Sequence, residues 1–147
     1  MNKSSVLAFM LGLCSLLSSI QGHAGSRSDF WDEHAVLMIY SSTCPYCHKQ
    51  AQVLAALKKD TSLPLMLYGV DDKPLAPFKN YQKADMGLLK SAFPDGKTHF
   101  PALFIVNRQN LNLYPLSKGF LGMRAFINRT SVLAKKIIAH EKEYSNA

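Results

Sequence analysis

Two cysteines separated by two residues carry the strongest chemical signal in this 147-residue sequence. Cys44 and Cys47 enclose Pro45 and Tyr46, and His48 follows directly, in the stretch "SSTCPYCHKQ". A Cys-x-x-Cys pair can act as a redox dithiol, whereas Cys-x-x-Cys-His is also the attachment sequence of c-type haem. The choice between these two chemistries depends on the compartment and on the fold that surrounds the cysteines.

The N-terminal residues have the pattern of a secretory signal peptide. Lys3 is followed by the apolar run "VLAFMLGLCSLLSSI" (6–20), which is short for a bilayer span. Gly22 and Ala24 are small residues suited to a cleavage site, so residues 1–24 are expected to be removed after Ala24. We therefore predict a periplasmic protein with one domain over 25–147. Retention of the apolar run as a membrane anchor is the alternative.

Cysteine usage favours a chemical role for the pair over a structural one. Cys14 would leave with the signal peptide, so Cys44 and Cys47 are the two cysteines of the mature chain. Exported proteins usually link distant segments by disulfides, and a bridge across two residues closes too small a loop to add much stability. A structural zinc ion needs four ligands, and no second ligand pair accompanies this one. We therefore predict no metal site.

The chain carries a formal net charge of +7, with its Lys and Arg residues scattered along the sequence. No compact basic stripe with interleaved aromatic residues is present, so nucleic-acid binding is not expected. A basic surface of this kind favours acidic client proteins or an anionic membrane face.

Hydrophobic patterning predicts an α/β domain with the order β-α-β-α-β-β-α. The apolar run 35–42 is typical of a buried strand, and Pro45 fits the first turn of the helix that follows. Further elements are expected at these ranges: strand 63–71, helix 84–93, strands 101–107 and 111–116, and helix 123–142. A helix joins the first two strands, so they should be parallel, while the last two should form an antiparallel hairpin. The result is a mixed four-stranded sheet flanked by helices.

This order, with Cys-Pro-x-Cys between the first strand and the first helix, resembles the thioredoxin-like fold over about residues 33–140. Phe100-Pro101, before the third strand, is similar to the family's cis proline position. The resemblance implies that Pro101 is cis and packs against the dithiol. Phe100 and Pro101, together with Pro45 and Tyr46, would then form the surface where the backbone of a client protein lies.

Two narrower resemblances concern function. The Cys-x-Tyr-Cys-His-Lys pattern is similar to the active-site stretch of periplasmic disulfide isomerases. The chain length, the signal peptide and the later "YPL" segment resemble the small thioredoxin-like proteins of F-type conjugative transfer systems, which help pilus assembly proteins to acquire disulfides. The implied partners are cysteine-containing exported clients, a membrane or periplasmic thiol redox partner, and components of a conjugation or secretion system.

The predicted activity is thiol:disulfide exchange without a cofactor. Cys44, just before the helix, would attack as a thiolate, because a helix N-terminus favours negative charge. Cys47, one turn further, would resolve the mixed disulfide. His48 either stabilises negative charge nearby or is a solvated helix residue. The pattern favours isomerase or reductase activity, and oxidase activity stays open.

Two departures from the thioredoxin pattern are present. Many thioredoxins carry a buried acid six residues before the first cysteine, where this chain has Met38, so a carboxylate proton relay is in doubt. The residue before the cis proline is often Thr or Val, and here it is Phe100.

Two alternatives to a redox enzyme remain. One is a c-type haem electron carrier, with His48 as one iron ligand and Met66, Met86 or Met123 as the other. The second is a non-catalytic thioredoxin-fold chaperone or assembly adaptor that binds a secretion component through the Phe100 surface.

Overall fold

The computed structural model describes residues 27–145. The predicted signal peptide and its cleavage after Ala24 lie outside the described residues and stay predictions, as does the division into domains. Within residues 27–145, no helix combines the length and the apolar character that a membrane span requires.

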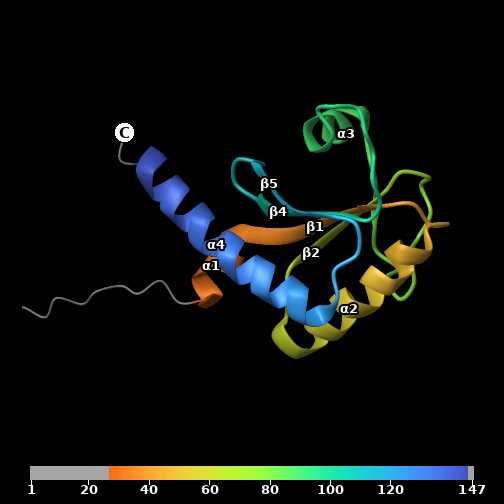
Figure 1. Ribbon diagram of the computed structural model, residues 1–147, viewed down its shortest axis with the longest axis horizontal. Helices are drawn as coiled ribbons and strands as arrows, with labels where there is room; N and C mark the ends of the chain where they lie inside the picture. The colour runs from red at the N-terminus through yellow and green to blue at the C-terminus, as the bar shows by residue number, and fades with distance from the viewer. Residues whose placement is uncertain (1–26, 146–147) are drawn as a thin grey trace, which may run out of the picture.

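Four helices and five strands make up the described chain (Figure 1). In chain order they are α1 (Arg27–Glu33), β1 (His34–Tyr40), α2 (Pro45–Thr61), β2 (Leu65–Gly69), β3 (Gln82–Lys83), α3 (Met86–Ala92), β4 (Ala102–Asn107), β5 (Leu113–Lys118) and α4 (Met123–Ser145). All seven predicted elements are present with shifted ends, while α1 and β3 were not predicted.

The strands form one mixed sheet in the order β3-β2-β1-β4-β5. β1 pairs in parallel with β2 and antiparallel with β4, and β4 pairs antiparallel with β5, as expected from the connections. The prediction of four strands was wrong, because β3 adds a fifth beside β2. β3 has only two residues, Gln82 and Lys83, both exposed, so no hydrophobic alternation could mark it in the sequence.

β1 is buried along its whole length because helices cover both faces of the sheet. Val36, Met38 and Tyr40 share one hydrophobic cluster with α2 residues, while Leu37 and Ile39 pack in another cluster with α3 residues. Figure 1 shows α3 on one side of the sheet and α1, α2 and α4 on the other. A continuous apolar run is therefore the pattern that this central strand needs.

Both edges of the sheet are interrupted. On one side the edge is the two-residue β3. On the other side the edge is β5, which contains Pro115 and shifts its register against β4 between Leu103 and Phe104. Proline has no N–H to offer to a further strand, and a bulge breaks the regular ladder.

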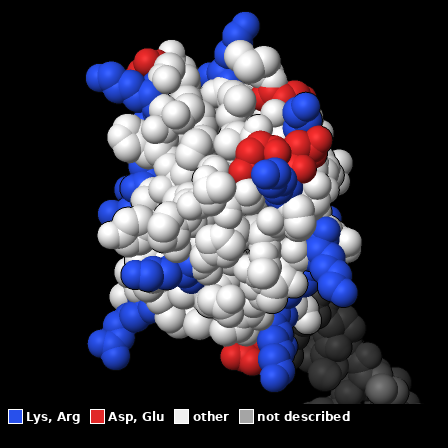
Figure 2. All heavy atoms as spheres, turned by 90° about the vertical axis from the view of Figure 1, so that its right-hand side faces the viewer, with Lys and Arg blue, Asp and Glu red and all other residues white. Residues whose placement is uncertain are grey.

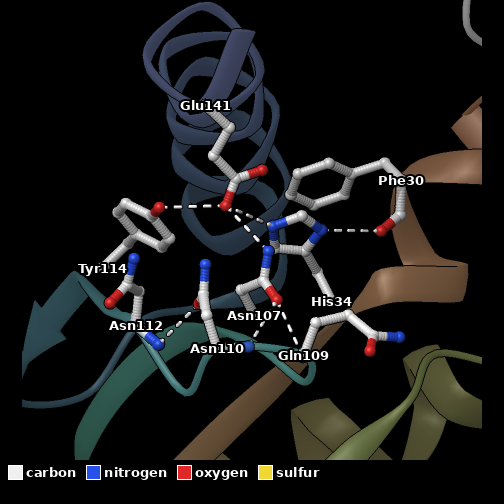
Figure 3. Close-up of polar contacts among 8 residues, drawn as sticks. All are labelled: Phe30, His34, Asn107, Gln109, Asn110, Asn112, Tyr114 and Glu141. Atoms are coloured by element: carbon white, nitrogen blue, oxygen red, sulfur yellow. Dashed lines mark hydrogen bonds and ion pairs between the residues drawn. The ribbon is translucent and has the colours of Figure 1, made fainter. Parts of the chain in front are cut away.

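A polar cluster lies at the end of the sheet where β1 begins (Figure 3). The carboxylate oxygen Oε1 of Glu141 on α4 accepts hydrogen bonds from Asn107 Nδ2 at 2.9 Å, Tyr114 Oη at 2.9 Å and His34 Nε2 at 3.2 Å. His34 Nδ1 lies 3.0 Å from the backbone oxygen of Phe30 on α1. These contacts fasten both α1 and α4 to the ends of β1, β4 and β5.

Candidate active site

The two cysteines lie at the opposite end of β1, where the strand leads into α2. Cys44 is the N-cap of α2, and its sulfur accepts a hydrogen bond from the Cys47 backbone N–H at 3.2 Å. Pro45 occupies the first turn of the helix, where its missing N–H leaves no intrahelical bond unmade. The free N–H groups and the positive end of the helix dipole therefore face the Cys44 sulfur.

The two thiols differ in exposure. Both are free, Cys44 is half-buried and Cys47 is fully buried in the cluster on the α2 side of the sheet. Burial raises the pKa of Cys47 to about 12, helped by its hydrogen bond to Cys44 and opposed by a hydrogen bond from the Ser41 backbone. Cys47 is therefore a protonated thiol at neutral pH. This geometry matches the predicted division into an accessible and a buried cysteine, although the catalytic roles stay predictions.

The Phe100-Pro101 peptide bond is cis, as the resemblance implied. The Cys44 thiol donates to the Phe100 backbone oxygen over 3.8 Å, so the dithiol and this bond are neighbours. Pro101 is fully buried, and its carbonyl accepts from Gly119 N at 2.7 Å. The Phe100 ring packs edge-on against Phe93 and contacts both core clusters. At this position it is therefore the backbone oxygen that contacts the Cys44 sulfur, while the ring packs against the core.

Tyr46 and His48 are both exposed beside the cysteines. The Tyr46 side chain is 58% accessible, and Lys49 Nζ lies 5.3 Å from the centre of its ring. The His48 Nε2 atom lies 2.8 Å from the Ser42 backbone oxygen, so this ring contacts the turn before α2. His48 is thus held in place at the surface, and its predicted tuning role stays a prediction.

Asp71 is part of the site but was missed by the sequence analysis. It follows β2, and its Oδ2 accepts from Ser42 N at 2.9 Å and from the hydroxyl groups of Ser42 at 2.6 Å and Ser41 at 3.4 Å. The Ser42 hydroxyl bond is the main reason why the pKa of Asp71 lies below its ordinary value. The signal available in the sequence was an acid at the end of the predicted strand 63–71, since parallel strands end at the same edge of a sheet.

Met38, at the position where many thioredoxins carry a buried acid, is completely buried among apolar side chains. β1 therefore supplies no carboxylate beneath the dithiol, and Asp71 reaches the site from the neighbouring strand.

Figure 2 shows the face of the molecule at which β1 ends and α2 begins. Its middle is free of charged side chains, Lys and Arg lie mainly around its edge, and the largest group of acidic atoms forms one patch off the centre.

The geometry disfavours haem attachment at Cys44-Pro45-Tyr46-Cys47-His48. Cys47 is completely buried, so a thioether bond to a porphyrin would require the start of α2 to open. Met66 packs on the other side of the sheet from Cys47, and Met86 and Met123 are exposed. Among residues 27–145, no group of three or more His, Cys, Asp or Glu residues could hold a metal ion.

Comparison with protein families finds a match to TraF, described as F plasmid transfer operon protein, over residues 28–130. The chain is also 24% identical over 98 residues to Protein TrbB of Escherichia coli (strain K12), a match that covers 67% of this chain and 54% of that protein. The chain thus spans about half the length of this relative.

Solved structures with the same fold are thioredoxin-like proteins. A thiol:disulfide interchange protein of the thioredoxin family from Chlorobium tepidum TLS superposes with a TM-score of 0.50 at 13% identity, covering 73% of this chain and 83% of that one. The exposed lipoprotein thioredoxin Etrx1 of Streptococcus pneumoniae strain TIGR4 gives a TM-score of 0.52 at 14% identity, covering 74% and 88%. The fold of this chain is therefore thioredoxin-like, as predicted.

Proposed function

The chain belongs to the TraF family of F plasmid transfer operon proteins, and on this premise we propose that it is a thiol:disulfide oxidoreductase that reduces or isomerises disulfides in exported client proteins. The observation that carries this proposal is the pairing of a half-buried Cys44 at the helix N-terminus with a buried, protonated Cys47. Such a pair provides one thiol that meets the client and one that is protected until it is needed.

The proposed reaction begins when the Cys44 thiolate attacks one sulfur of a client disulfide. A Cys44–client disulfide forms, and the other client sulfur leaves as a thiolate. In reduction, Cys47 loses its proton to solvent and attacks Cys44, so the client leaves with two thiols and the dithiol becomes a disulfide. In isomerisation, a second client thiolate attacks the mixed disulfide and releases Cys44 unchanged, with no net transfer of electrons.

The backbone at Phe100 supports a binding role during this reaction. The Phe100 carbonyl accepts from the Cys44 thiol in the free protein. Once Cys44 is a thiolate or part of a mixed disulfide, its S–H no longer donates, and the carbonyl is free to pair with an extended client segment. Tyr46 and Pro45 are exposed on the same rim of the site. We propose all of these residues as the client surface.

Clients in a conjugation or secretion apparatus, a periplasmic location and a membrane or periplasmic redox partner belong to the same proposal. They follow from the family and from the predicted signal peptide. For this chain they need a direct test, because its match spans about half of Protein TrbB.

The test compares refolding of scrambled ribonuclease and reduction of insulin by a small dithiol with oxidation of reduced ribonuclease, and adds the equilibrium constant with glutathione. We expect faster reshuffling than with the Cys44→Ala, Cys47→Ala double variant, which is the matched control. Equal rates for the two proteins in reshuffling and in reduction would contradict the proposal and would favour a non-catalytic chaperone or adaptor.

A further inference from the structure

The turn Ser41-Ser42 connects Asp71 to both cysteines. The Ser41 carbonyl accepts from Cys44 N at 3.2 Å, and the Ser41 backbone donates to the Cys47 sulfur. Asp71 holds the same turn through the Ser42 N–H and hydroxyl. The Ser41-Ser42 turn therefore fixes the position of the Asp71 carboxylate relative to the two cysteines.

Asp71 itself is held rigidly by the end of β1. The Val70 N–H donates to the Tyr40 carbonyl at 2.9 Å, and the Tyr40 hydroxyl donates to the Lys73 carbonyl at 2.7 Å. Gly69 allows this close approach, because a Cβ there would lie 3.1 Å from the Lys73 oxygen and from the Tyr40 ring. The segment that carries Asp71 therefore has little freedom to move its charge away.

The two carboxylate oxygens of Asp71 differ in their hydrogen bonds. Its Oδ2 takes all of the bonds from the turn, whereas Oδ1 is buried without a hydrogen-bond partner among the described residues. The lowered pKa of Asp71, due chiefly to the Ser42 hydroxyl, keeps the carboxylate ionised at neutral pH. It is therefore a poor proton acceptor and a persistent negative charge near the dithiol.

Cys47 is acted on by few charged or titratable groups. Burial is the main cause that disfavours its thiolate, the Cys44 side chain adds to it, and the negative charge of Asp71 adds a smaller contribution. Tyr40, which faces Asp71, packs in the same cluster as Cys47. When Cys44 enters a mixed disulfide, its own charge disappears. Asp71 is then the charge that still opposes ionisation of Cys47.

We propose that the negative charge of Asp71 delays the attack of Cys47 on the mixed disulfide at Cys44, so that a bound client has time to rearrange its own disulfides. This inference rests on the proposed function and narrows it toward isomerisation. Asp71 acts here as a positioning residue that touches neither client nor sulfur. A slower resolving step favours isomerisation because the client's own thiolates compete with Cys47 for the mixed disulfide.

The reaction of the reduced full chain with Ellman's reagent, an aromatic disulfide, separates the two steps. Attack by Cys44 forms the Cys44–thionitrobenzoate disulfide and releases one coloured thionitrobenzoate anion. Attack by Cys47 then forms the Cys44–Cys47 disulfide and releases a second anion. The first phase depends on reagent concentration and the second does not, so stopped-flow absorbance gives both rates.

Asp71→Asn keeps an oxygen for the Ser42 donors and removes the charge. Each unit by which the Cys47 pKa falls gives about ten times more thiolate but about a threefold weaker nucleophile. We therefore expect the second phase at neutral pH to be faster by up to about threefold, with the midpoint of its pH profile moved to lower pH and the first phase nearly unchanged. Asp72→Asn, a change at the exposed neighbouring acid, should leave both phases alone.

Asp71→Ser also removes the charge while keeping a hydrogen-bond acceptor. If both variants change the second phase in the same way, a folding defect specific to the Asn variant cannot be the cause. A second phase that is unchanged or slower, with an unmoved pH midpoint in both variants, would overturn the inference. Absence of the first phase in the wild-type protein would instead overturn the proposed function, since Cys44 would then not attack disulfides.

Discussion

The two ends of the β1–β4 pair hold their polar groups in opposite ways. Where β1 begins, one oxygen of Glu141 satisfies donors from His34, Asn107 and Tyr114 (Figure 3). Where β1 ends, Cys47 is a buried thiol and one oxygen of Asp71 is buried without a partner among the described residues. The first arrangement stabilises the fold, and the second, which holds the groups of the proposed reaction, leaves polar atoms buried at some cost in stability.

The largest expected effect comes from removing the accessible sulfur. Cys44→Ala should lower disulfide exchange to the background rate of the solution, because no other described thiol is accessible. Insulin reduction by a small dithiol, followed by turbidity, measures this loss. Cys47→Ala is the informative partner variant, since it should instead accumulate a mixed disulfide that gel electrophoresis without reductant detects. Substantial insulin reduction by Cys44→Ala would break the assignment.

Removing the Glu141 carboxylate, at the end of the sheet where β1 begins, should lower the stability of the fold without changing the rate of disulfide exchange. Glu141→Ala would leave three donors without their acceptor, which should cost about 2–4 kcal/mol in the free energy of unfolding. Urea unfolding measures this value. Glu143→Ala, at an exposed position on the same helix, should change it by less than about 0.5 kcal/mol. Equal effects of the two variants would show that the cluster does not fasten α4.

Alkaline pH should destabilise the reduced protein more than the oxidised one. Cys47 ionises near its ordinary pKa of 9.0 in the unfolded chain but at about 12 in the folded one. The unfolded state therefore loses a proton first as pH rises, and stability falls between these two values. We expect an additional loss of about 1–3 kcal/mol after allowing for screening. The raised pKa of Tyr40 also lowers stability at alkaline pH, but by the same amount in the reduced and the oxidised protein. The quantity to measure is therefore the difference between the thermal midpoints of these two forms.

The smallest expected effect concerns His48. Its exposed ring contacts the Ser42 carbonyl, in the turn that joins Asp71 to the cysteines, at 2.8 Å, but within residues 27–145 it makes no hydrogen bond to Asp71 or to a cysteine sulfur. His48→Ala should therefore change either phase of the Ellman reaction by less than about threefold. A larger loss confined to the first phase would show that His48 tunes Cys44 and would move it into the site. Lys49→Ala is a suitable control on the same exposed helical turn.

The parts of this fold that follow from local pattern were predictable from the sequence. The continuous apolar run of β1, the helix that starts at Pro45 and the hairpin of β4 and β5 each carry a recognisable signal, and the structure confirms them. β3 was missed because two exposed residues pair with β2 through their backbone alone. Helix α1 gave no usable pattern, since it is a single short helix of seven residues.

Only part of the site was predictable from the sequence. Cys44 and Cys47 stand out by their spacing, and the position of Pro101 follows from the resemblance to thioredoxin-like proteins. Asp71 lies far from them in sequence and meets them because β2 is parallel to β1. Its hydrogen bonds to Ser42 depend on the geometry of a turn, which no residue pattern encodes.

The interrupted edges of the sheet have a consequence for the proposed action on unfolded client polypeptides. Incoming clients are extended chains in search of hydrogen-bond partners, and a long, regular border strand would invite them to add to the sheet and aggregate. Here one border is only two residues long, and the opposite one contains Pro115 and a change of register. Both edges therefore disfavour the addition of a further strand, and under the proposed function this leaves the backbone beside Cys44 as the place where a client segment binds and is released.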